Sequence, residues 1–295
     1  EEMKKYAIFL GCTVPVRAQH YELSARNVAK ELNIELAEIP GASCCGFPMK
    51  AVDAETALLI AARNISLASR LNLDVVTLCN SCTAMLTDAQ AQLSNDEFRR
   101  EFSRVGLSYP HEVKVRHFVR MLYEDIGIEG IKKAVKRPLH ELKIVAHYGC
   151  HYMRPSGLYN FDNTEVPHTL DDLVRVTGAQ AIDYADKKMC CGGSVLGIDE
   201  ELAVTMSNHK LSIAHDNGAD AIVSICPFCT VMYEDNQRKA EARFNKQYAI
   251  PVLYYPQLLG LSLGLTSDAV GLKFNRIKPD PILSKLTVRE QRGQQ

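Results

Sequence analysis

The sequence lacks the patterns that mark several common classes of protein. It contains neither of the glycine-rich nucleotide signatures, G-x-G-x-x-G and G-x-x-x-x-G-K-[ST], and no G-x-S-x-G nucleophile motif. Its net charge of −1 gives no sign of a nucleic-acid partner or of a membrane surface. The longest apolar stretch, residues 252–265, is broken by Pro256, Gln257 and Gly260 and is too short to span a bilayer.

The first residues also lack the charged-then-apolar pattern of an export signal. The chain has 295 residues, of which 46% are apolar, as expected of a globular protein with one large or two medium domains. We therefore expect a cytoplasmic protein with no membrane span. In such a reducing compartment thiols are free to bind metal.

The ten cysteines form two sets of five, and no cysteine lies outside this pattern. Each set reads C, then C-C-G, then C-x-x-C. Equivalent members are separated by 138, 146 and 147 residues, so the chain contains an internal duplication. The first set is Cys12, Cys44, Cys45, Cys79 and Cys82, and the second is Cys150, Cys190, Cys191, Cys226 and Cys229.

Strand and helix patterns alternate in both halves, which predicts an α/β fold made of two duplicated Rossmann-like modules. We expect parallel sheets related by a pseudo-two-fold axis. The predicted first module covers 1–137 and includes a charge-rich helical connector from 94 to 140. The second covers 138–272, and 273–295 is read as an extended or disordered C-terminal arm. The cysteines of each module should converge, because two in each, Cys12 and Cys79 in the first and Cys150 and Cys226 in the second, follow predicted strands. Ligands bind at the carboxyl ends of parallel strands.

Five thiolates per module point to soft metal chemistry. Disulfides are a poor interpretation, since disulfide scaffolds are small and secreted. A structural zinc site takes four ligands and leaves a fifth cysteine without a role. An irregular iron–sulfur assembly with a bridging thiolate uses all five, and a cubane cluster with one spare cysteine is the alternative.

Several neighbours of these cysteines could support such a site. Gly46, Gly192 and Gly193 allow the backbone to approach a bulky inorganic core at positive φ. His147 and His151 flank Cys150 and could hydrogen-bond to a ligand or donate a proton. They could equally be packing residues at the end of a strand. The other histidines have no partner spacing and are expected to be structural or exposed.

With these motifs the chain resembles the B subunit of heterodisulfide reductase, in the CCG-domain family. The likeness covers nearly the whole chain, including His147-Tyr148-Gly149-Cys150-His151 and Cys226-Pro227-Phe228-Cys229. It implies that each module holds a noncubane [4Fe-4S] cluster on its five cysteines. It also implies that catalysis belongs to the two clusters themselves, which would face one cavity where the mixed disulfide CoM-S-S-CoB is split. The first C-C-G loop, residues 44–49, looks shorter than in methanogen members, which leaves a related disulfide as an alternative substrate.

The resemblance implies an oxidoreductase acting on a sulfur group, as one component of a complex. Two partners, a ferredoxin-like iron–sulfur protein and a flavin protein, would deliver the electrons as further subunits, with a hydrogenase or formate dehydrogenase as an additional partner. Two other functions stay open. One is a CCG electron-transfer subunit of a quinone-linked or 2-hydroxy-acid oxidoreductase. The other is a non-catalytic module in which clusters or zinc only hold the fold or relay electrons.

Overall fold

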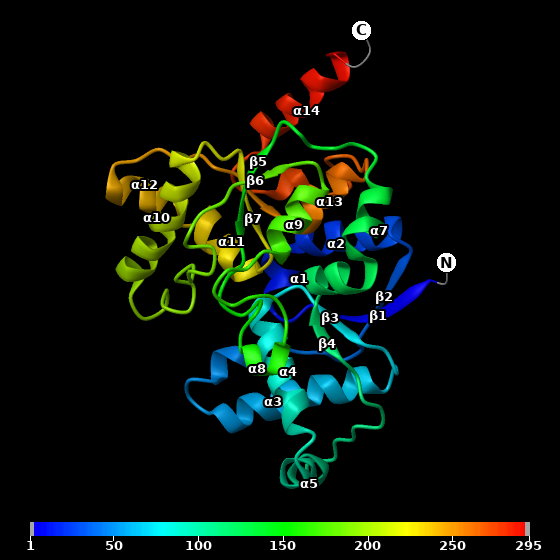
Figure 1. Ribbon diagram of the computed structural model, residues 1–295. Helices are drawn as coiled ribbons and strands as arrows, with labels where there is room; N and C mark the ends of the chain where they lie inside the picture. The colour runs from blue at the N-terminus through cyan, green and yellow to red at the C-terminus, as the bar shows by residue number, and fades with distance from the viewer. Residues whose placement is uncertain (1–2, 293–295) are drawn as a thin grey trace.

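The computed structural model describes residues 3–292, the side chains of 288–292 excepted, and contains two parallel four-stranded sheets (Figure 1). The first has the order β2-β1-β3-β4, and the second has the equivalent order β6-β5-β7-β8. All adjacent strands are parallel. The predicted α/β fold of two similar modules is therefore confirmed. The strands are β1 (Lys4–Phe9), β2 (Ile34–Glu38), β3 (Val75–Thr77), β4 (Val115–His117), β5 (Lys143–His147), β6 (Gln180–Ala181), β7 (Ala221–Ser224) and β8 (Val252–Tyr254).

Helices connect the strands in both modules. Those of the first are α1 (Thr13–Arg17), α2 (Gln19–Glu31), α3 (Ala54–Ser69), α4 (Asn80–Gln92), α5 (Asp96–Arg104), α6 (Phe118–Met121), a π-helical turn (Leu122–Ile126) and α7 (Gly127–Ala134). Those that follow are α8 (Ser156–Tyr159), α9 (Thr169–Val176), α10 (Glu200–Asp216), α11 (Pro227–Glu234), α12 (Gln237–Phe244), α13 (Tyr255–Ser262) and α14 (Asp280–Arg292). Two short 3₁₀ turns occupy Phe47–Met49 and Leu272–Phe274.

The two modules use the same local devices to start their long helices. Asp53 caps α3 by accepting the Thr56 N–H, and Asp199 caps α10 by accepting the Leu202 N–H, each at 2.9 Å. These aspartates are 146 residues apart, the same separation as between the two C-C-G elements. A carboxylate at the N-cap satisfies free amides and interacts favourably with the helix dipole. Each cap fixes where the helix begins after its C-C-G loop.

Side chains from both modules pack into shared cores. Helix α2 lies against α13 (Figure 1). The Tyr21 ring stacks on Tyr254 with centroids 3.9 Å apart. The Tyr21 hydroxyl donates to the Ile225 carbonyl at 3.1 Å, and the buried His117 Nε2 bonds the same oxygen at 2.8 Å. Both apolar clusters contain residues from each half of the chain. The modules are thus held rigidly against each other, which positions their cysteines jointly.

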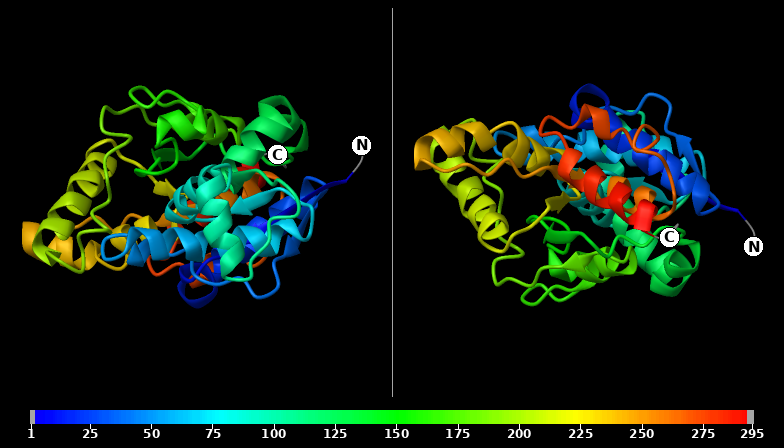
Figure 2. Two further views of the ribbon diagram at one scale, coloured as in Figure 1. Left: turned by 90° about the horizontal axis from the view of Figure 1, so that it is seen from below. Right: turned by 90° about the horizontal axis from the view of Figure 1, so that it is seen from above.

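The less regular segments differ in part from expectation. The connector is helical in pieces, as expected, through α5, α6 and α7, but it also contains β4, the fourth strand of the first sheet. The C-terminal arm is not extended, because residues 280–292 form α14, which is nearest the viewer in the right-hand view of Figure 2. Its Lys285 donates to the Asp220 carboxylate at 2.6 Å, at the amino end of β7. Ile282 and Leu286 are buried one turn apart, and Pro281 is in the first turn, where proline is tolerated. Across 3–292, no helix is both long and apolar enough to cross a membrane.

Candidate metal centre

The ten cysteines converge at the carboxyl ends of the strands. Cys79 and Cys226 are the extended N-cap residues of α4 and α11, directly after β3 and β7. Cys12 begins α1 after β1, and Cys150 follows β5. The C-C-G loops bring the remaining thiols over these ends. All ten cysteines are free thiols, and six of them are buried.

Their sulfur atoms form one continuous chain of contacts. Cys12 and Cys44 have sulfurs 3.8 Å apart. The central contact joins Cys79 Sγ of the first module to Cys226 Sγ of the second, also at 3.8 Å. The remaining thiol–thiol hydrogen bonds connect Cys44 to Cys45, Cys45 to Cys82, Cys82 to Cys79, Cys226 to Cys229, Cys229 to Cys191, Cys191 to Cys190, and Cys190 to Cys150.

This crowding shifts the thiol pKa values in opposite directions. A hydrogen bond from a neighbouring thiol lowers the pKa of three cysteines, with Cys82 acting on Cys45, Cys150 on Cys190, and Cys229 on Cys226. The donating thiols have their pKa raised for the same reason, and burial raises the pKa of Cys44 to about 11. Thiolates packed this closely repel one another. Ionisation of the whole set therefore requires multivalent cations among the sulfurs.

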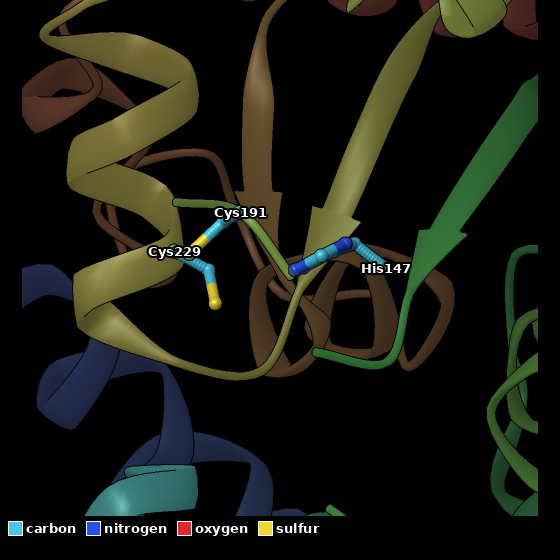
Figure 3. A group of neighbouring side chains, drawn as sticks. All are labelled: His147, Cys191 and Cys229. Carbon is cyan, nitrogen blue, oxygen red and sulfur yellow. The ribbon is translucent and has the colours of Figure 1, made fainter. Parts of the chain in front are cut away.

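Backbone amides and a histidine complete the donor set of the second module. The Gly192 and Gly193 N–H groups donate to Cys190 Sγ and Cys191 Sγ, each at 3.4 Å. His147 is fully buried, and ligand atoms of His147, Cys191 and Cys229 lie within 4.8 Å of one another (Figure 3). Its Nε2 atom has no hydrogen-bond partner among the residues that the structure describes. Soft sulfur ligands with amide donors and an orphaned imidazole nitrogen fit an iron–sulfur group or a zinc ion.

The second flanking histidine, His151, lies in the loop that was predicted for it. Its Nδ1 is 3.0 Å from Cys150 Sγ, and its ring meets Phe47 edge-on with centroids 5.7 Å apart. Burial lowers the pKa of His151, which disfavours the imidazolium. Burial also lowers the pKa of His147, to about 3. Both imidazoles are therefore neutral near pH 7, with one N–H each to donate.

Two of the three predicted glycines make room for a neighbouring helix, and not for a metal group as expected. Gly46 and Gly192 both have φ of +86°. A Cβ at these positions would lie 2.6 Å from the Ala57 carbonyl oxygen and 2.8 Å from that of Ala203. They allow the loops to pack against α3 and α10. Gly193 does not have the positive φ expected of it. A Cβ there would lie 2.4 Å from Phe228 Cδ1 and 3.3 Å from Cys191 Sγ, so this glycine makes room for the Phe228 ring beside the sulfurs.

Sequence reasoning missed a second pair of glycines. Gly11 and Gly149 have φ of +65° and +73°. A Cβ would lie 2.8 Å from Cys82 Sγ at the first and 3.6 Å from Cys229 Sγ at the second. The signal was available, because a glycine precedes the first cysteine of both sets. These residues keep the backbone close to the sulfurs.

A cavity of about 410 Å³ opens at one end of the sulfur chain. Both modules line it, and the first C-C-G loop forms one wall through Phe47 and Lys50. The lining residues are Phe47, Lys50, Ala84, Met85, Asp88, Cys150, His151, Arg154 and Pro155. The cavity thus combines apolar surface, the cationic side chains of Lys50 and Arg154, and a direct approach to Cys150. Its one carboxylate, Asp88, lies 3.4 Å from the Lys50 ammonium.

The fold and the paired cysteine sets define a duplicated cysteine-rich domain protein. The family model described as a cysteine-rich domain, CCG, matches residues 6–87 and again 144–234. One relative from Methanosarcina acetivorans, the B subunit of a ferredoxin/F420H2-dependent CoB-CoM heterodisulfide reductase, is 38% identical over 96% of this chain and 97% of its own length. The chain belongs to the CCG-domain family that includes the B subunits of heterodisulfide reductases.

Other relatives carry different names. The 8-methylmenaquinol:fumarate reductase membrane anchor subunit of Wolinella succinogenes is 32% identical over 93% of this chain and 97% of its own length. A solved structure of a hypothetical protein from Helicobacter pylori shares the fold, with a TM-score of 0.75 at 15% identity. The match covers 94% of this chain and 53% of that protein.

Proposed function

We propose that this chain is the catalytic, disulfide-reducing subunit of a heterodisulfide-reductase-type complex. The single observation that carries the proposal is the continuous sulfur chain, which joins both modules at Cys79 and Cys226 and reaches the cavity at Cys150. Reducing a disulfide to two thiols consumes two electrons and two protons. Two adjacent one-electron centres, the second of which borders the cavity at Cys150, meet the electron requirement.

In this proposal each set of five cysteines holds one noncubane [4Fe-4S] cluster. When bound, the two clusters would supply the electrons, and their irons would act as Lewis acids toward the leaving sulfurs. The residues of the chain have separate tasks. The cysteines fix the distance between the two sites, and the Gly192 and Gly193 amides stabilise negative charge on sulfur. The ten free thiols fit a reducing compartment, the cytoplasm.

The cavity residues would bind and protonate a small disulfide. Lys50 and Arg154 offer positive charge to anionic groups on the substrate, and Phe47 offers an apolar wall. His151 lies 3.0 Å from Cys150 Sγ at the cavity surface and can hold a proton for a departing thiolate. CoM-S-S-CoB or a related anionic disulfide fits this combination. Fixing it beside both sites removes much of the entropic cost of the encounter.

The electrons would arrive from partner subunits. The chain has no flavin or nicotinamide signature, so it requires a ferredoxin-like iron–sulfur subunit, with a flavin subunit behind it. A hydrogenase or formate dehydrogenase would be a more distant donor. The relatives named as B subunits of CoB-CoM heterodisulfide reductases support an assembly of this kind.

A quinone-linked electron-transfer subunit is the second candidate. The relative named as a menaquinol:fumarate reductase subunit favours it. So do two exposed aliphatic residues at equivalent places after the C-C-G elements, Val52 and Ile198, which are 82% and 89% exposed. Exposed apolar side chains at such sites suit contact with a lipid or another subunit.

The expected result is that anaerobically reduced protein is reoxidised by an anionic heterodisulfide, with two thiols released for each disulfide consumed. Absorbance of the iron–sulfur chromophore follows the reoxidation, and thiol titration measures the product. Lys50→Ala should raise the disulfide concentration needed by about fivefold, since one exposed charge contact contributes on the order of 1 kcal/mol. Lys246→Ala, which lies outside the cavity, is the matched control.

Reoxidation by a soluble menaquinone analogue, with no reaction toward CoM-S-S-CoB or other anionic disulfides, would establish the second candidate instead. Protein that carries iron and sulfide but reacts with neither oxidant would point to a relay that needs no substrate.

A further inference from the structure

The two modules differ at one pair of positions beside their metal centres. His147 ends β5, and the residue 138 places earlier, at the end of β1, is Phe9. Tyr233 in α11 has Leu86 of α4 as its counterpart, 147 places earlier. All four side chains are at most 1% exposed. The duplication therefore retains a buried polar pair in the second module and has a buried apolar pair in the first.

The rings of His147 and Phe9 occupy equivalent places. A Cβ on Gly149 would lie 3.7 Å from His147 Nε2, and a Cβ on Gly11 would lie 3.6 Å from Phe9 Cε1. These two glycines are themselves equivalent and border Cys229 and Cys82. The imidazole nitrogen thus stands where the first module has an aromatic carbon.

Hydrogen bonding fixes the direction of the imidazole. Tyr233 Oη lies 3.3 Å from His147 Nδ1, and the two rings meet edge-on with centroids 4.8 Å apart. When the tyrosine hydroxyl donates to Nδ1, the proton of the neutral ring is on Nε2. Nε2 has no hydrogen-bond partner within residues 3–292 and faces Cys191 and Cys229 (Figure 3). A buried N–H without an acceptor is costly, so this atom needs a sulfur acceptor at the metal centre.

The surroundings of the second site are also more positive. Lys210 of α10 is 1% exposed, and its ammonium donates to Tyr184 Oη at 3.1 Å. Burial lowers the pKa of Lys210 to about 7, whereas negative charge on Asp186 and Cys229 raises it, so an anionic metal centre favours the ammonium form. The counterpart of Lys210, 146 places earlier, is the neutral Asn64, which donates to the Cys44 carbonyl at 2.9 Å. Positive charge near a cluster favours its reduced, more negative state.

We propose that His147 donates an Nε2–H hydrogen bond to sulfur at the second metal centre and makes that centre the easier of the two to reduce. Hydrogen bonds to cluster sulfurs raise reduction potentials, and the first module has no equivalent donor at Phe9. The second centre is also the one whose Cys150 borders the cavity. The first electron to enter the protein therefore resides next to the substrate. This inference rests on the proposed function, since it assumes an iron–sulfur group in each module.

The test is a redox titration of the anaerobic protein followed by electron paramagnetic resonance. The native protein should show two reduction waves. His147→Phe, which copies the first module, should move the higher wave to lower potential by at least a tenfold change in the one-electron equilibrium, about 59 mV, and leave the lower wave in place. His147→Gln keeps an N–H donor and should leave the higher wave close to its native potential. Phe9→His combined with Leu86→Tyr should bring the two waves together.

Tyr233→Phe keeps a buried ring and removes only the hydroxyl that sets the imidazole tautomer. It therefore tests the role of the His147 hydrogen bond even if His147→Phe fails to assemble. We expect a smaller shift of the same wave. Three results would each overturn the inference. The first is a higher wave that is unchanged in Tyr233→Phe and in any His147→Phe protein that assembles. The others are equal potentials for the two centres in the native protein, and a His147→Gln shift as large as that of His147→Phe. Zinc in place of iron and sulfide would instead overturn the proposed function, and this inference with it.

Discussion

Replacing either Cys82 or Cys229 by alanine is expected to abolish disulfide reduction, although each change removes a ligand from only one module. Cys82 hydrogen-bonds to Cys45 and Cys79, and Cys229 to Cys191 and Cys226. Each therefore joins the C-C-G loop of its module to the central Cys79–Cys226 contact. Cleavage of a disulfide needs two electrons, and each iron–sulfur group supplies one. Turnover should fall by more than about 100-fold, because loss of a metal ligand should cost more than loss of a hydrogen bond to a ligand, which lowers activity by up to about 100-fold.

The measurement is thiol release per chain, together with iron content and the spectrum of the remaining centre. Ser81→Ala, inside the first C-x-x-C but with both cysteines retained, is the matched control and should keep full activity. Substantial turnover after the complete loss of one centre would show that a single site suffices. In that case the cooperative mechanism would have to be dropped.

A second large effect is expected when the glycine of either C-C-G element is changed to alanine. Gly46 and Gly192 have φ of +86°, and the added methyl would meet the Ala57 or Ala203 carbonyl oxygen. Left-handed strain and overpacking together should lower the free energy of unfolding by about 3 kcal/mol. The loop would also move away from α3 or α10, so the variants should lose iron from the affected module.

Gly197→Ala provides the control within the same second loop. Gly197 has no positive φ, and a Cβ there would meet no atom within 4 Å. This variant should unfold and bind iron as the native protein does. Thermal unfolding of the anaerobic proteins, with iron analysis before heating, measures both effects. Native stability and iron content in Gly46→Ala and Gly192→Ala would contradict the packing role of these glycines.

The duplication and the convergence of the cysteines could be predicted because they depend on periodic features of the chain. Cys79 and Cys226 follow apolar strands, and parallel strands bring their carboxyl ends together. The contact between these two sulfurs could not be predicted. It depends on how one sheet packs against the other through residues such as Tyr21 and Tyr254, and no local pattern encodes that packing.

Other features were left open or missed because two physical interpretations of one residue competed. The strand pattern indicated that His147 would be buried, and burial suggested packing; the structure shows a buried ring that still faces two sulfurs. The three residues of β4 are too few for a strand signal inside a charge-rich segment. The prolines of the C-terminal segment suggested an extended arm, yet Pro281 in the first turn of α14 is compatible with a helix.

Quantitative analysis of iron, acid-labile sulfide and zinc in the anaerobically purified protein tests most directly whether each module holds an iron–sulfur cluster. Two [4Fe-4S] groups on ten cysteines predict roughly eight iron and eight sulfide per chain with little zinc. Zinc at one or two per chain with little sulfide would contradict it.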